Sequence, residues 1–116
     1  MASILIIDDD ASVRTFLKQT LEKVGHQVRE APDGQSGMDL FREAHADLVI
    51  TDIFMPETDG FAVIDFVRGE NPDTRIITVT AGLGDDCAIA RERGASRTLV
   101  KPLSVRELLE TVEEVL

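Results

Sequence analysis

The chain has 116 residues, 43% of them hydrophobic, which suits one domain with an ordinary core, and we expect that domain to span residues 1–116. Its 22 acidic and 12 basic residues give a formal net charge of -10, which disfavours direct binding to nucleic acid or to an anionic membrane surface. The only cysteine, Cys87, excludes an intramolecular disulfide, and no apolar run approaches the roughly 20 residues that cross a bilayer, so we expect a cytoplasmic protein.

In the first half of the chain, strand patterns alternate with helix patterns. An apolar strand over residues 3–7 precedes a helix whose apolar residues recur at three- and four-residue steps and which ends at Gly25. The short run 27–30 is polar at alternate positions, which indicates a strand at the edge of the sheet. A turn at residues 33–34 begins the second helix, and the next apolar strand covers residues 48–51.

The second half of the chain continues the same alternation. A third helix follows the turn at residues 59–60, and a strand over 75–79 leads to a short fourth helix that stops before Gly94. A strand over 98–100 precedes the last helix, which begins after the capping-box residue Ser104. Five strands that alternate with five helices predict an α/β protein with a parallel sheet.

Charged residues follow three of these strands. Asp8 and Asp9 follow the first strand, Asp52 follows the third, and Lys101 follows the fifth. In open parallel sheets ligands bind beyond the carboxyl ends of the strands, so we expect these side chains to converge. Clustered carboxylates repel one another unless a cation shares them, which predicts a divalent metal beside an anionic group. Asp10, by contrast, suits the N-cap of the next helix.

Several short motifs stand in a specific order between Ile4 and the last helix. They are Asp8-Asp9, the segment Thr51-Asp52-Ile-Phe-Met-Pro56 followed by Asp59-Gly60, then Thr80-Ala81, Gly94-Ala95 and Lys101-Pro102. In order and spacing, these motifs resemble the receiver domain of bacterial two-component response regulators. The resemblance covers nearly the whole chain and implies a flavodoxin-like, doubly wound sheet of five parallel strands in the order 2-1-3-4-5, with five helices.

The resemblance implies roles for three catalytic residues. Asp52 would be the phosphoacceptor, because a carboxylate can act as a nucleophile and form an aspartyl phosphate. Lys101 would pair with the phosphoryl oxygens, and the Thr80 hydroxyl would donate a hydrogen bond to one of them. The family also usually holds the bond between Lys101 and Pro102 in the cis form.

The resemblance also implies a magnesium site. The carboxylates of Asp8, Asp9 and Asp52 and the backbone carbonyl of Phe54 would hold Mg²⁺. This set suits the ion, because Mg²⁺ prefers oxygen ligands and shares carboxylates with phosphate oxygens.

The chain departs from the family pattern near the expected site. Thr98 stands where many receivers have an aromatic residue that swings inward on activation, so the output signal should be weaker or differently shaped. Phe54 and Gly82 lie two residues beyond Asp52 and Thr80, where hydrolytic water should approach. Neither side chain can position that water by hydrogen bonding, so we expect slow loss of phosphate.

The expected function is therefore a phosphorylation-dependent signalling switch, not a turnover enzyme. Its partner would be a sensor histidine kinase or a histidine phosphotransfer protein, with output through a further domain or self-association by the fourth and fifth helices. One alternative is a pseudo-receiver that binds partners without phosphorylation. A less favoured one is a small phosphohydrolase of the haloacid dehalogenase type, with Asp8 as nucleophile in the motif Asp8-x-Asp10-x-Ser12.

Overall fold

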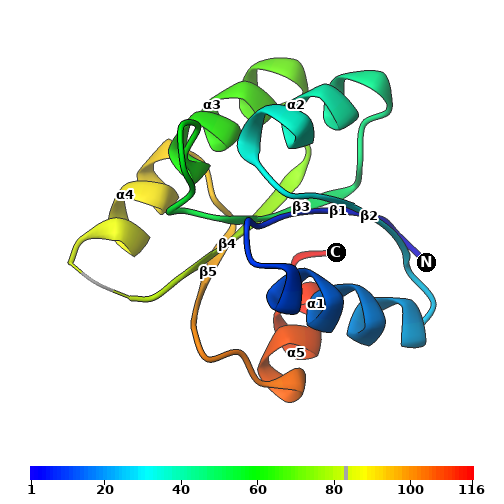
Figure 1. The fold of residues 1–116 in the computed structure, drawn as a ribbon. Helices are drawn as coiled ribbons and strands as arrows, with labels where there is room; N and C mark the ends of the chain where they lie inside the picture. The colour runs from blue at the N-terminus through cyan, green and yellow to red at the C-terminus, as the bar shows by residue number, and fades with distance from the viewer. Residues whose placement is uncertain (83) are drawn as a thin grey trace.

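The computed structural model describes residues 1–82 and 84–116, which form a parallel sheet between two layers of helices (Figure 1). The strands are β1 (Ser3–Ile7), β2 (Gln27–Ala31), β3 (Leu48–Asp52), β4 (Arg75–Thr80) and β5 (Arg97–Val100). They lie in the order β2-β1-β3-β4-β5, and all neighbouring strands run parallel. This order confirms the predicted flavodoxin-like sheet, and β2 lies at an edge as its polar sequence indicated.

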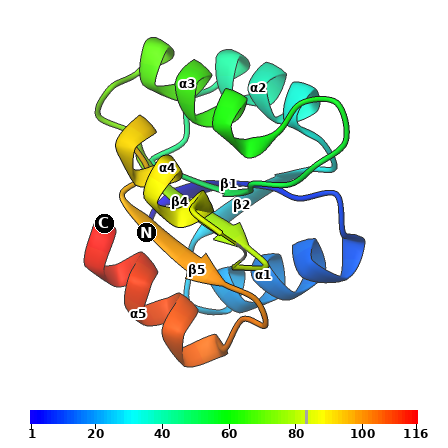
Figure 2. The same cartoon turned by 90° about the vertical axis from the view of Figure 1, so that its left-hand side faces the viewer.

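The helices of the described residues are α1 (Ala11–Lys23), α2 (Gly34–Glu43), α3 (Gly60–Glu70), α4 (Asp86–Arg93) and α5 (Val105–Val115). Helices α2, α3 and α4 cover one face of the sheet, and α1 and α5 cover the other (Figures 1 and 2). Four helices have an N-cap residue whose side chain accepts a hydrogen bond from a backbone N–H of the first turn. These N-cap residues are Asp10, Asp33, Asp59 and Ser104. The predicted capping roles of Asp10 and Ser104 are thus confirmed.

The core consists of two clusters, one on each face of the sheet. Successive side chains of a strand point to opposite faces, so Leu5 and Ile7 of β1 pack with α2 and α3 while Ile4 and Ile6 pack with α1 and α5. Helices on both faces explain why the central strands read as continuous apolar runs. Within residues 1–82 and 84–116, none of the helices has the length and hydrophobicity of a membrane-spanning segment.

The strand order changes direction between β1 and β3. From β1 the chain passes to β2 on one side, and it then returns to β3 on the other side of β1. Such a switch point opens a crevice beyond the carboxyl ends of the two central strands. Asp8 and Asp9, which follow β1, and Asp52, the last residue of β3, therefore lie at neighbouring strand ends.

Candidate functional site

The structure brings three acidic side chains together at this switch point. In the ladder between β1 and β3, Ile7 pairs with Thr51, so the residues that follow them, Asp8 and Asp52, stand level with each other. One carboxylate oxygen from each of Asp8, Asp9 and Asp52 lies within 4.8 Å of the others. Asp8 and Asp52 are buried, whereas Asp9 is exposed. The cluster is therefore open to solvent on the side of Asp9.

Lys101 joins the cluster from the end of β5. Its Nζ lies 3.4 Å from Oδ2 of Asp8 and 3.5 Å from Oδ2 of Asp52. The backbone N–H of Lys101 donates to the carbonyl oxygen of Thr80 at 2.8 Å, which fixes the start of its loop to the end of β4. The peptide bond between Lys101 and Pro102 is cis, as the resemblance implied. All four strand-end charges that the sequence singled out thus meet in one place.

The electrostatics of the cluster are unfavourable without a further cation. Burial raises the pKa of Asp52, and the nearby charge of Asp8 raises it further. Burial likewise raises the pKa of Asp8. Burial alone would lower the pKa of Lys101, but the attraction of Asp8 and Asp52 outweighs it, so this pKa lies above its ordinary value. One lysine therefore compensates the buried acids only in part.

The donor atoms of the cluster fit a cation that takes oxygen ligands. Oδ2 of Asp8 is buried and accepts no hydrogen bond of normal geometry from the described residues, and its charged neighbour is the Lys101 ammonium at 3.4 Å. Buried polar atoms normally have hydrogen-bond partners, so a buried carboxylate oxygen that has only an ion pair and lies close to two further acids is suited to bind a cation. A hard divalent cation that keeps several waters would satisfy Asp8 and the exposed carboxylate of Asp9 together.

The loop after β3 folds closely over the end of that strand. A Cβ on Gly60 would lie 2.3 Å from the carbonyl oxygen of Asp52 and 2.7 Å from Cα of Ile53, so only glycine fits. The N–H of Gly60 also donates to the carbonyl oxygen of Ile53 at 2.7 Å. The backbone amide of Phe54 lies near enough to the Asp52 carboxylate to lower its pKa, against the larger effect of burial. The sequence marked Gly60 as a turn but gave no sign of this contact.

Thr80 is the last residue of β4 and is fully buried. Its Oγ1 accepts a hydrogen bond from the N–H of Gly82 at 3.3 Å. Gly82 has a φ of 83°, and a Cβ there would lie 2.7 Å from Cγ1 of Val100. The hydroxyl of Thr80 is thus linked to the loop before α4, and that loop contacts β5.

Arg14 is a neighbour of the site that sequence reasoning missed. Its Nη1 donates to the backbone carbonyl oxygen of Asp8 at 2.7 Å, and its Nε donates to Oε1 of Glu30 at 3.1 Å. A signal was present in the sequence, since a basic residue early in a helix opposes the helix dipole and needs a nearby acid.

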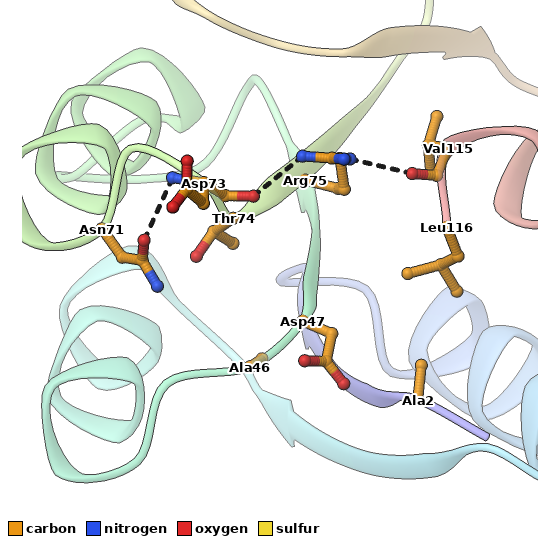
Figure 3. Close-up of a pocket in the computed structure, with 9 residues that line it drawn as sticks. All are labelled: Ala2, Ala46, Asp47, Asn71, Asp73, Thr74, Arg75, Val115 and Leu116. Atoms are coloured by element: carbon orange, nitrogen blue, oxygen red, sulfur yellow. Dashed lines mark hydrogen bonds between the residues drawn. The ribbon is translucent and has the colours of Figure 1, made fainter.

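A hollow of about 480 Å³ lies at the opposite end of the strands (Figure 3). Its lining includes Asp73 and Arg75, which bond to other backbone and side-chain groups of the same hollow. Arg75 donates to the carbonyl oxygens of Asp73 at 3.0 Å and Val115 at 2.9 Å, and the N–H of Asp73 donates to Asn71 at 3.0 Å. These bonds fix the C-terminal ends of α3 and α5. The acid cluster lies at the other end of the sheet, beyond the carboxyl ends of the strands.

Comparison with known proteins gives a consistent family. A family model described as the response regulator receiver domain matches residues 4–113. The probable transcriptional regulator ycf27 of Galdieria sulphuraria is 44% identical over 107 residues, which cover 90% of this chain and 41% of that protein. The DNA-binding transcriptional regulator NtrC of Azospirillum brasilense is 38% identical over 116 residues, which cover 99% of this chain and 24% of that protein. The chain thus spans about a quarter to two fifths of the length of these two relatives.

Solved structures agree with the sequence comparison. The chemotaxis protein CheY4 of Vibrio cholerae superposes with a TM-score of 0.94 at 32% identity, covering 100% of this chain and 99% of that one. The receiver domain of NtrX from Brucella abortus gives a TM-score of 0.90 at 27% identity, covering 97% of this chain and 96% of that one. Both likenesses extend over essentially the whole fold.

Proposed function

Because this chain belongs to the response regulator receiver domain family, whose general function is a phosphorylation switch in two-component systems, we propose that Asp52 is its phosphoacceptor. The observation that carries the proposal is the position of the Asp52 carboxylate. The residue is 6% exposed, and its carboxylate lies 3.5 Å from the Lys101 ammonium and close to the carboxylates of Asp8 and Asp9. The phosphoryl donor would be a phosphohistidine on a sensor histidine kinase or on a histidine phosphotransfer protein.

In the proposed reaction, a carboxylate oxygen of Asp52 attacks the phosphorus atom. The bond between phosphorus and the histidine nitrogen breaks, and its electron pair stays with the imidazole, which takes up a proton. Asp52 must be ionised to attack, although burial and Asp8 raise its pKa. The positive charge of Lys101 favours the ionised form, and the backbone amide of Phe54 does the same.

Asp8, Asp9 and Asp52, with the backbone carbonyl of Phe54, would hold Mg²⁺ in this site. The ion would supply the charge that offsets the clustered carboxylates and the oxygens of the incoming phosphoryl group. Support comes from Oδ2 of Asp8, which is buried without a hydrogen bond from the described residues, and from the close approach of the three carboxylates. In this role the three acids would bind the cation through carboxylate oxygens at the end of the sheet where the phosphoryl group arrives.

Lys101 and Thr80 would contact the oxygens of the new phosphoryl group. Lys101, which bridges Asp8 and Asp52, can transfer its contact from the Asp52 carboxylate to a phosphoryl oxygen. Thr80 would rotate to donate its hydroxyl hydrogen to another oxygen, and this rotation disturbs the bond it accepts from Gly82. The loop before α4 would then favour a second arrangement, which is the switch.

We extend the proposal to the wider context of the chain. Residues 1–116 would form one receiver domain that acts in the cytoplasm and catalyses only its own phosphorylation and dephosphorylation. Output would pass through a further domain, as the names of the transcriptional regulators among the relatives suggest, or through self-association by α4 and α5. The phosphohydrolase alternative has little support, because Asp10 accepts bonds from the backbone of Ser12 and Val13 as a helix cap.

The test is intact mass after incubation with acetyl phosphate and magnesium. The wild-type protein should gain one phosphoryl increment that is stable in acid and labile in base. The increment should be absent from Asp52→Asn and from a sample treated with EDTA. No increment would favour the pseudo-receiver, and an increment that persists in Asp52→Asn would move the phosphoacceptor to another residue.

A further inference from the structure

We infer that Arg14 is a positioning residue for the acids of the site, acting through the backbone of Asp8. The inference rests on the proposed function, because it assigns the β1–α1 loop the task of presenting Asp8 and Asp9 to Mg²⁺. Nη1 of Arg14 donates to the carbonyl oxygen of Asp8 at 2.7 Å, a charge-assisted bond to the first peptide group beyond β1. Within residues 1–82 and 84–116, Arg14 makes no hydrogen bond or ion pair with the carboxylates of the cluster or with Lys101.

The position of Arg14 in α1 suits this role. It follows the N-cap Asp10 by one turn, and its N–H donates to the carbonyl oxygen of Asp10 at 3.0 Å. Helical side chains point back toward the N-terminus, so the guanidinium reaches over the end of β1. A cation near a helix N-terminus opposes the helix dipole, and here the neighbouring acids compensate for that cost.

Glu30 of β2 fixes the orientation of the guanidinium. Its Oε1 accepts from Nε of Arg14 at 3.1 Å, while its Oε2 lies 3.4 Å from Nζ of Lys18. The planar fork of arginine can bond Glu30 and the Asp8 carbonyl at once, which a lysine at this position could not reproduce. The Arg14 side chain is 17% exposed and that of Glu30 is 34% exposed, so their contact is partly shielded from water.

The bond matters most for Asp9. The Asp9 carboxylate is exposed and accepts no hydrogen bond from another described side chain or backbone group, so its placement depends on the backbone before it. That backbone is held by three contacts. The N–H of Asp8 donates to Ala31 at 3.2 Å, the N–H of Asp10 donates to Oδ1 of Asp8 at 2.8 Å, and Arg14 binds the Asp8 carbonyl between them. Removing Arg14 frees the peptide group that joins Asp8 to Asp9.

The experiment compares Mg²⁺ affinity in Arg14→Ala, Arg14→Lys, Lys18→Ala and the wild type, measured by calorimetric titration without phosphate. Groups that orient metal ligands typically affect affinity 10–100-fold, so we expect Arg14→Ala to weaken Mg²⁺ binding about tenfold. Arg14→Lys should bind Mg²⁺ almost as weakly as Arg14→Ala does. Lys18→Ala is the matched control, because it removes a cation from the same Glu30 without touching Asp8, and it should bind Mg²⁺ as the wild type does.

A second readout uses the metal-free protein. Amide hydrogen exchange at Asp10, whose N–H donates to Asp8, should be faster in Arg14→Ala than in Lys18→Ala.

A third readout is the Mg²⁺ dependence of phosphorylation by acetyl phosphate. In Arg14→Ala the Mg²⁺ concentration for half-maximal rate should rise about tenfold, while saturating Mg²⁺ restores the rate. A general loss of stability would lower the maximal rate as well.

Unchanged Mg²⁺ affinity in Arg14→Ala would overturn the inference, and so would an equal loss in Lys18→Ala. If Arg14→Ala does not fold, Glu30→Gln can be used instead, because it weakens the bond that orients Arg14. Its Mg²⁺ affinity should be lower than that of the wild type, by less than about tenfold. Wild-type affinity in Glu30→Gln would then overturn the inference. Failure of the wild type itself to bind Mg²⁺ would overturn the proposed function together with this role, and it is recognised without any variant.

Discussion

The ammonium group of Lys101 lies 3.5 Å from the Asp52 carboxylate, at the point where β5 and β3 leave the sheet. The same ammonium is 3.4 Å from Asp8, so one cation serves two buried acids. The lysine side chain is 27% exposed while those of Asp8 and Asp52 are 2% and 8% exposed. Lys101 thus closes the buried side of the cluster and remains accessible to an incoming anion.

Lys101→Ala should destabilise the metal-free protein. Removing the cation leaves two buried carboxylates close together, although partial solvent exposure of the lysine limits the effect, and we expect a loss of about 1–2 kcal/mol. Urea denaturation in EDTA measures it, with Lys18→Ala as a control for a partly exposed lysine that pairs only with Glu30. Equal stability of the two variants would show that the Lys101 contacts are too weak to matter.

The stability of the metal-free protein should depend on the charge of Asp52. Its folded pKa is raised by burial and by Asp8, so the folded state binds a proton more tightly than the unfolded state does. Stability should therefore fall as pH rises from the unfolded value of 3.8 through the folded pKa, and the cost stays at higher pH.

Asp52→Asn removes this dependence at one position. In EDTA the variant should gain stability relative to wild type on going from about pH 4 to about pH 7, because it lacks the carboxylate whose ionisation is costly in the folded state. Melting temperatures across that range check it. A constant difference between the two proteins would mean that burial does not perturb Asp52.

Gly60→Ala should damage both the fold and the site. The added methyl would lie 2.3 Å from the carbonyl oxygen of Asp52, and backbone on both sides must shift to relieve the clash. Overpacking of this kind costs about 1–3 kcal/mol. Displacement of Asp52 should also slow phosphorylation by acetyl phosphate.

Gly69→Ala is the matched control in the same helix, because a Cβ there meets nothing within 4 Å. Alanine is the better helix former, so this variant should be more stable than wild type by about 0.5–1 kcal/mol. Chemical denaturation of both variants tests the pair. Similar effects at residues 60 and 69 would argue against the close approach of α3 to the end of β3.

The phosphoryl group on Asp52 should be long-lived. The Phe54 side chain is 52% exposed and apolar, and Gly82 has no side chain, so neither can hold the attacking water. Phe54→Asn places a hydrogen-bonding group there at an exposed position and should speed hydrolysis several-fold, up to about tenfold, by orienting water. Decay of the mass increment after removal of acetyl phosphate gives the rate, with Phe54→Leu as the apolar control. Complete wild-type decay within seconds would contradict the prediction.

The sequence by itself determined the fold class and the members of the acid cluster. Alternating strand and helix patterns predict a parallel sheet, because strands buried on both faces are apolar throughout, as β3 is. In such a sheet the carboxyl ends of strands meet at one edge, so acids at the ends of β1 and β3 must lie near each other. Element ends were predicted to within two residues for α1 and one residue for β2.

Only the tertiary structure decided how these residues are supported. The bond from Arg14 to the Asp8 carbonyl and the contact of Gly60 with the Asp52 backbone join segments whose relative positions depend on helix packing. Local sequence patterns carry the period of a helix or strand, but they do not carry the distance between two packed elements. The burial of Oδ2 of Asp8, which accepts no hydrogen bond from the described residues, likewise depends on the packing of the whole fold.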